Sequence, residues 1–158
     1  MRCTEEWDSH CRQLIVDNSE WIKRVGGLSC KTPCIFGDLM GCVRKNLFHK
    51  DDPFWVKFEK VDEAPLYQTQ YCFTHGCQCS LVDKKADLEV AGLPCPDYSV
   101  AGKRLQENGP TIGAFLTHAK RHVSLQTRII VVENVKDQGL IGVVSGLECT
   151  SFKTIIYM

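Results

Sequence analysis

The sequence lacks any excess of one charge and any long apolar run. Its 158 residues include 19 basic and 19 acidic side chains, so no overall charge draws the chain toward nucleic acid. No stretch approaches the roughly 18 apolar residues of a membrane span, and no internal repeat or low-complexity tract is present. Residues 1–7 contain no apolar signal segment. These absences predict a single globular domain that is neither secreted nor inserted in a membrane.

Cysteine, by contrast, is abundant, with ten residues. In a chain without a signal segment, free thiols are the ordinary interpretation of so many cysteines. Four potential metal ligands fall within eight residues: Cys72, His75, Cys77 and Cys79. Their spacing differs from paired Cys-x-x-Cys knuckles, and ligands this close leave little room for tetrahedral zinc. We therefore assign no metal site, and a zinc-binding interaction module at residues 72–79 stays an alternative.

The stretch over residues 87–102 organises the chain. An apolar run that ends at Gly92 predicts a strand, and in the following loop Cys95 lies between two prolines. Pro94 fixes its own φ, and Pro96 favours an extended conformation at Cys95. A cysteine held just beyond the carboxyl end of a strand lies where open α/β sheets bind their ligands. This position suits a nucleophile.

A second apolar run, from Arg128 to Val135, also predicts a buried strand. It contains an acid, Glu133, near its carboxyl end. If this strand lies parallel to the first, Glu133 reaches the same rim of the sheet as Cys95.

These two segments resemble motifs of the cytosine-5 DNA methyltransferases. Gly92-Leu-Pro-Cys95, followed by Asp97-Tyr-Ser99 and Gly102, is similar to the Pro-Cys loop of that family. Glu133-Asn-Val135 is similar to its Glu-Asn-Val motif and follows Cys95 by 38 residues, a spacing that the family also uses. Each motif alone is weak, but both in this order, each at a strand end, are specific.

The resemblance implies a Rossmann-like α/β fold and an S-adenosylmethionine-dependent reaction. Cys95 would add to carbon 6 of cytosine, and Glu133 would bond ring nitrogen 3 and the exocyclic amine. DNA would be the substrate, in the nucleus or the cytoplasm, and a tRNA methyltransferase is an alternative because the motifs serve both branches. The same resemblance assigns further substrate contacts to Ser99, Arg104 and Asn134, and a cofactor contact to Pro94.

Earlier segments are similar to the family's cofactor motifs. Glu6 and Trp7 precede a predicted helix over residues 9–25 and resemble the pair that contacts ribose and adenine. Asp38, with Leu39, ends a short strand and resembles the Gly-Asp motif that accepts from the adenine amino group. The structural alternatives are that Trp7 packs at a helix start and that Asp38 closes a turn.

The resemblance covers the middle of a methyltransferase domain over residues 1–158, with an insertion at about residues 40–82. The family's first strand with its Phe-x-Gly-x-Gly-Gly loop, and its target-recognition region, have no counterpart in the sequence. We therefore expect a truncated fold with unpaired strand edges, which a partner chain would complete. A non-catalytic remnant is the alternative to an active enzyme.

Two further elements are predicted in the second half of the chain. A helix begins near Thr111, and a final strand runs from Phe152 to Tyr157. A modest basic set would contact phosphates or else form a solvated helix face: Lys103, Arg104, Lys120, Arg121 and His122.

Overall fold

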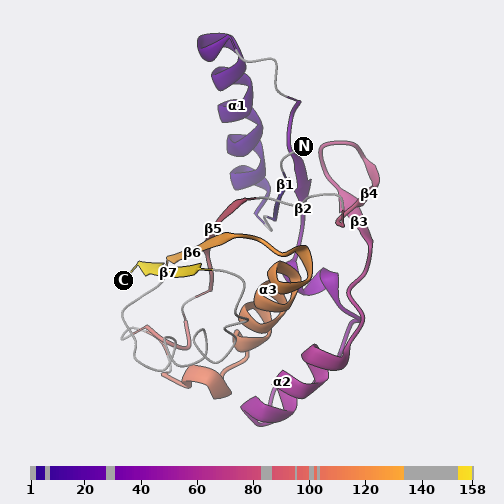
Figure 1. Cartoon of the computed structure of the whole chain (residues 1–158), viewed down its shortest axis with the longest axis vertical. Coiled ribbons are helices and arrows are strands. Elements are labelled where there is room, and N and C mark those ends of the chain that lie inside the picture. The colour runs from indigo at the N-terminus through magenta and orange to yellow at the C-terminus, as the bar shows by residue number, and fades with distance from the viewer. Residues whose placement is uncertain are drawn as a thin grey trace. The chain divides into compact units, whose positions relative to one another are not determined.

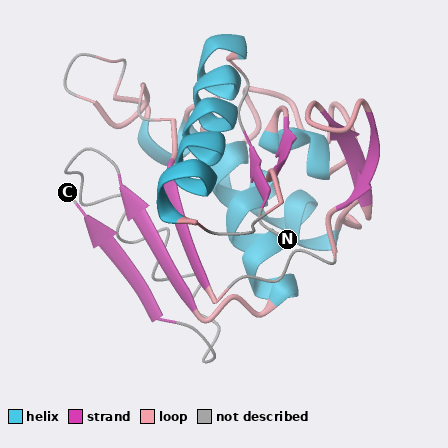
Figure 2. Ribbon diagram, turned by 90° about the horizontal axis from the view of Figure 1, so that it is seen from above, coloured by secondary structure: helices cyan, strands magenta, loops and turns pink. Residues whose placement is uncertain are grey.

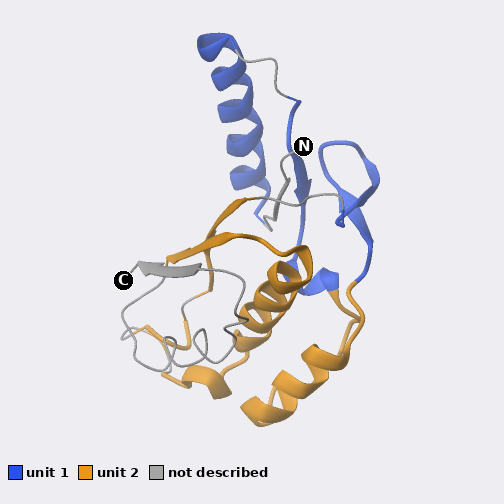
Figure 3. Ribbon diagram, in the orientation of Figure 1, with its two compact units in different colours: residues 1–42, 67–84 blue, residues 43–66, 85–158 orange. Residues whose placement is uncertain are grey.

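The protein is described from a computed structural model (Figure 1), which shows a mixed α/β fold as the sequence predicts. The described residues are 3–5, 8–27, 31–82, 87–94, 96–99, 102, 104–133 and 153–157. They form two compact units (Figure 3): unit 1 comprises residues 1–42 and 67–84, and unit 2 comprises residues 43–66 and 85–158. Among the helices of the described residues, none is long and apolar enough to cross a membrane.

Unit 1 contains a pair of parallel strands. β1 (Cys3–Glu5) pairs with β2 (Cys34–Phe36), and Glu5 lies opposite Phe36. All three residues of β2 are buried, and a short 3-10 helix, η1 (Leu39–Cys42), follows. The carboxyl ends of both strands therefore lie at one end of this small sheet.

An antiparallel hairpin packs beside β2 in the same unit. It consists of β3 (Thr69–Cys72) and β4 (Cys77–Ser80). The backbone N–H of Phe73 donates to the carbonyl oxygen of Ile35 at 2.8 Å. The Thr74 hydroxyl donates to the Pro33 carbonyl oxygen, also at 2.8 Å. Two hydrogen bonds therefore join the hairpin turn to β2 and to Pro33, the residue before it.

Helix α1 (Ser9–Gly26) begins and ends where the sequence predicts. The Asp8 carboxylate accepts from the backbone N–H groups of His10 and Cys11 at 2.8 and 3.0 Å, which caps the first turn. Gly27 ends the helix with a φ of 60°, a left-handed conformation that glycine adopts without strain. None of the residues of α1 is buried.

Unit 2 contains a sheet of three parallel strands (Figure 2). Its order is β5 (Leu88–Gly92), β6 (Ile129–Glu133) and β7 (Lys153–Tyr157). Helix α3 (Ile112–Leu125) connects β5 to β6, as a parallel connection requires. The sequence predicts a single Rossmann-like sheet, but the described strands form separate sheets of two, two and three strands.

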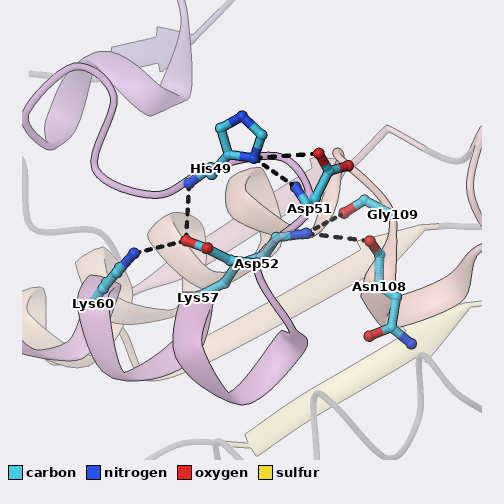
Figure 4. Close-up of polar contacts among 7 residues, drawn as sticks. All are labelled: His49, Asp51, Asp52, Lys57, Lys60, Asn108 and Gly109. Carbon is cyan, nitrogen blue, oxygen red and sulfur yellow. Dashed lines mark hydrogen bonds and ion pairs between the residues drawn. The ribbon is translucent and has the colours of Figure 1, made fainter.

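Two lysines join α3 to α2 (Phe54–Glu63), a helix within the predicted insertion. Lys57 of α2 is fully buried and donates to the carbonyl oxygens of Asn108 and Gly109 at 3.2 and 3.4 Å (Figure 4). These carbonyls belong to the last residue of η2 (Gln106–Asn108) and to its C-cap residue, shortly before α3. In the other direction, the Lys120 ammonium group donates to three carbonyl oxygens at the end of α2, those of Val61, Asp62 and Ala64.

Candidate active site

The carboxyl ends of β5 and β6 lie side by side in unit 2. Gly92, the last residue of β5, is the register partner of Glu133, the last residue of β6. The Glu133 side chain is exposed. Cys95 lies outside the described residues, but it follows Gly92 by three positions. The predicted parallel pairing of these two strands is therefore confirmed. Glu133 lies at the edge of the sheet where β5 ends and the Pro-Cys loop begins.

The loop that follows Cys95 is held by Asp97. This carboxylate is buried, with 3% exposure, and its Oδ2 atom accepts from the backbone N–H and the hydroxyl of Thr111 at 2.9 and 2.6 Å. Thr111 is the N-cap residue of α3, yet its own side chain makes no capping hydrogen bond. Asp97 thus supplies a negative charge and an acceptor at the start of α3, where both are favourable.

Two glycines permit the close packing of this loop. A β-carbon on Gly109 would overlap the Asp97 carboxylate, and a β-carbon on Gly102 would overlap the carbonyl oxygen of Pro96. The backbone N–H of Gly102 also donates to the Ser99 carbonyl oxygen at 3.0 Å. Pro96 and Gly102, which bracket the turn, are therefore in direct contact.

Phe115 of α3 and Lys57 of α2 support the same loop. The Tyr98 ring is buried against Phe115 of α3, with ring centroids 5.4 Å apart. The Lys57 ammonium group binds the carbonyl of Gly109, the glycine that contacts Asp97. The position of Asp97 within the Pro-Cys motif is the only sequence signal for this support. A helical lysine is usually exposed, so nothing in the sequence marks Lys57.

The other predicted substrate residues have varied surroundings. Ser99 is half-buried, whereas Pro94 and Arg104 are exposed. Arg104 has a φ of 52°, a backbone conformation that is uncommon for a residue other than glycine. Asn134 lies outside the described residues.

The basic side chains of α3 do not form the predicted phosphate-binding surface. The ammonium group of Lys120 binds carbonyl oxygens of α2, and Arg121 and His122 are buried. The alternative of a solvated helix face is wrong for the same reason. Lys103 lies outside the described residues, so Arg104 is the exposed cation of this set in the described part of the chain.

In unit 1, the predicted cofactor residues follow the carboxyl ends of β1 and β2. Glu6 and Trp7 lie outside the described residues. Asp38 is exposed, and its Oδ1 atom accepts from the backbone N–H of Met40 at 2.9 Å, so this carboxylate closes a turn. Leu39 is half-buried and begins η1.

Helix α3 carries a pair of buried histidines, one of which lies close to β5. The rings of His118 and His122 are 4.4 Å apart, and His122 Nε2 lies 3.7 Å from a carboxylate oxygen of Glu89. Burial lowers the pKa of His118 to about 4, and the charge of Arg121 adds to this effect. Burial also lowers the pKa of His122 to about 3, with contributions from His118 and Arg121. Both histidines are therefore neutral at pH 7.

Comparison with known proteins gives one match. The model of the family described as C-5 cytosine-specific DNA methylase matches residues 66–153, which is more than half of the chain. No curated protein and no solved structure matches the chain. The matched range contains both predicted motifs, at Cys95 and Glu133, and it begins within the predicted insertion at residues 40–82.

Proposed function

The chain belongs to the C-5 cytosine-specific DNA methylase family, and on this premise we propose that it is a DNA cytosine-5 methyltransferase with a Rossmann-like fold. Its reacting groups are Cys95 and Glu133. The observation that carries the proposal is the register of β5 and β6, which pairs Gly92 with Glu133. This register brings the acid to the strand end from which the Pro-Cys loop departs.

Cys95 is the proposed nucleophile. Carbon 5 of cytosine is a poor nucleophile, and addition of a thiolate to carbon 6 converts the ring into an enamine that reacts at carbon 5. The reaction requires the sulfur to be held in one place. Asp97, two residues after Cys95, supports this role because its buried carboxylate ties the loop to α3.

Glu133 is the proposed partner of the cytosine ring. Negative charge develops on the ring as the sulfur adds, and a carboxyl group that bonds nitrogen 3 and the exocyclic amine stabilises it. The Glu133 side chain is exposed at the end of β6, so a base can reach it. Asn134, the next residue, is proposed to contact the same base.

S-adenosylmethionine, when bound, supplies the methyl group that carbon 5 receives. Among the described residues of unit 1, the exposed Asp38 carboxylate after β2 is the group that suits binding of the adenosine moiety. Its Oδ1 atom holds the Met40 N–H, which leaves Oδ2 as the acceptor for an adenine amino group. Glu6 and Trp7 follow β1, whose carboxyl end lies beside that of β2, and they are proposed to contact ribose and adenine together with Leu39.

The proposed substrate is cytosine in DNA, and the base must leave the helix to reach a cysteine, at a cost of a few kcal/mol. Arg104 is exposed and suits a backbone phosphate. Ser99 is half-buried in the loop and is the third proposed substrate contact.

The test is covalent trapping on DNA that contains 5-fluorocytosine, in the presence of S-adenosylmethionine. The fluorine blocks elimination, so an adduct persists on a denaturing gel only after both attack and methylation. We expect an adduct with the whole chain, none with Cys95→Ser, and a reduced yield with Glu133→Gln. Cys77→Ser is the matched control, since Cys77 is exposed and belongs to unit 1. Absence of the adduct from folded protein, or its persistence in Cys95→Ser, would contradict the proposal.

A further inference from the structure

A sulfur-rich group in unit 1 takes no part in the proposed reaction. It comprises Cys34 of β2, Cys72 of β3, His75 of the hairpin turn and Cys79 of β4, and their ligand atoms all lie within 4.8 Å of one another. The sequence groups Cys77 with the other hairpin residues, but Cys77 is exposed and is not a member of this group. The fourth ligand is instead Cys34, which precedes Cys72 by 38 residues.

The distances in this group are those of a coordination shell. The Nδ1 atom of His75 lies 3.2 Å from the sulfur of Cys72, 3.5 Å from that of Cys79 and 3.6 Å from that of Cys34. A tetrahedral zinc ion, with Zn–S bonds of about 2.3 Å and Zn–N bonds of about 2.0–2.1 Å, separates sulfur from nitrogen by about 3.6 Å. The objection that four ligands from residues 72–79 are too close for a tetrahedron does not apply to this set.

Hydrogen bonding does not account for three sulfurs around one nitrogen. An imidazole nitrogen either carries one proton or offers one lone pair, so Nδ1 makes one good hydrogen bond. A single cation at the centre of the group would satisfy the nitrogen and all three sulfurs at once. The convergence of these four atoms therefore points to a metal ion.

Burial and backbone hydrogen bonds hold these ligands in place. Cys34 and Cys72 are buried, with 1% and 0% exposure. The hairpin turn that carries His75 is joined to β2 and the residue before it by the hydrogen bonds of Phe73 and Thr74. Gly76, with a φ of 66°, closes the turn by donating to the Cys72 carbonyl oxygen at 2.9 Å.

We propose that Cys34, Cys72, His75 and Cys79 bind one zinc ion in a structural site. Thiolates with imidazole select zinc among the common divalent ions, and four protein ligands leave no open position for substrate. The ion links β2 to the hairpin, and two-stranded sheets of this size gain little stability from pairing alone. This proposal is independent of the methyltransferase proposal, because none of its ligands belongs to the reacting groups.

Metal analysis of the purified chain tests the stoichiometry. After dialysis against metal-free buffer, we expect one zinc ion per chain by mass spectrometry of the elements. Cys34→Ser and Cys79→Ser should lose it, whereas two controls should retain it: Cys77→Ser, from the same hairpin, and Cys42→Ser, at a buried cysteine of the same unit. Less than one-tenth of an equivalent of zinc, iron in its place, or full zinc content in Cys34→Ser would overturn the proposal.

A measurement on the unsubstituted chain covers the case in which the variants do not fold. Each cysteine is alkylated under native conditions before and after removal of metal with a strong chelator, and its modification is read by peptide mass spectrometry. Cys79 is only partly buried, so its reactivity reports on the metal rather than on burial alone. We expect chelation to accelerate alkylation of Cys79 at least tenfold and of exposed Cys77 less than twofold. Equal changes at both residues would overturn the proposal, since a bound ion protects only its own ligands.

Discussion

Gly92 and Glu133 face each other across parallel strands, and the Oε2 atom of Glu133 lies 3.5 Å from the place of a β-carbon on Gly92. This separation is an ordinary van der Waals contact. The glutamate carboxylate therefore rests against a strand end that has no side chain of its own. The size of residue 92 should control where that carboxylate lies.

Enlarging Gly92 is expected to impair the reaction in proportion to side-chain size. Gly92→Ala should keep the adduct with 5-fluorocytosine DNA, because its methyl group fits. Gly92→Leu should displace Glu133 and slow adduct formation about 10- to 100-fold, since small misplacements of reacting groups have large effects. The initial rates of adduct formation by the two variants test this prediction, and urea unfolding verifies that both variants are folded. Equal rates in both variants would show that the Glu133 carboxylate position is unimportant.

Asp97→Ala is expected to lower the free energy of unfolding by about 2–3 kcal/mol, because two hydrogen bonds to Thr111 and the capping charge are lost. Gly109→Ala should also destabilise, because its methyl group would overlap the Asp97 carboxylate. Gly92→Ala, a change from glycine to alanine without overlap, is the matched control. Urea denaturation measures all three. If Gly109→Ala is as stable as Gly92→Ala, the close approach of Gly109 to Asp97 is refuted.

Two lysines of α2 are expected to differ sharply on replacement by methionine. Lys57→Met leaves the carbonyl groups of Asn108 and Gly109 without their buried donor, which should lower the free energy of unfolding by about 1–3 kcal/mol. Lys60 instead forms a partly exposed ion pair with Asp52 at 2.7 Å (Figure 4), and such pairs contribute about 0–1 kcal/mol. Thermal or urea unfolding of both variants tests this order, and a larger loss for Lys60→Met would contradict it.

Acidification is expected to destabilise unit 2 through His118 and His122. Their folded pKa values, about 4 and about 3, lie below the ordinary value of 6.5. Below pH 6.5 the unfolded chain therefore binds protons that the folded chain excludes, so the stability present at neutral pH is lost as pH falls toward 4. Each histidine contributes a slope of up to about 1.4 kcal/mol per pH unit.

Urea unfolding between pH 7.5 and 5 measures this slope. His118→Leu should reduce it, whereas His49→Gln, which changes an exposed histidine, should leave it unchanged. An unaltered slope in His118→Leu would show that His118 is not buried in its neutral form.

The same substitution at two valines of the three-stranded sheet should have different effects. Val90 of β5 is 65% exposed and Val132 of β6 is 3% exposed. Val132→Thr places a hydroxyl in the core and should cost about 1–3 kcal/mol, and Val90→Thr should stay within about 0.5 kcal/mol. Comparison of the two unfolding midpoints tests which face of the sheet is covered, and equal losses would contradict this assignment.

Features that depend on neighbouring residues could be predicted from the amino-acid sequence. The helical period of α1 is encoded within a few positions, and so are the strands that contain Gly92 and Glu133. The two short motifs were also sufficient to indicate the family, which the match over residues 66–153 confirms. Local sequence carries this information because caps, periodicity and prolines act on the backbone beside them.

Contacts between side chains far apart in the sequence became visible only in the folded chain. Asp97 accepts from Thr111, the N-cap residue of α3, which lies 14 residues later, and Lys57 reaches a carbonyl 51 residues away at Asn108. Cys34 joins the hairpin ligands across a similar span of the chain. Spacing along the sequence does not specify such contacts, because they form only when strands pair and helices pack. For this reason the sequence suggests a phosphate contact for Lys120, whereas in the packed chain its ammonium group binds carbonyl oxygens of α2. The sequence likewise groups Cys77 with the potential metal ligands of the hairpin, whereas the packed chain brings Cys34 to them.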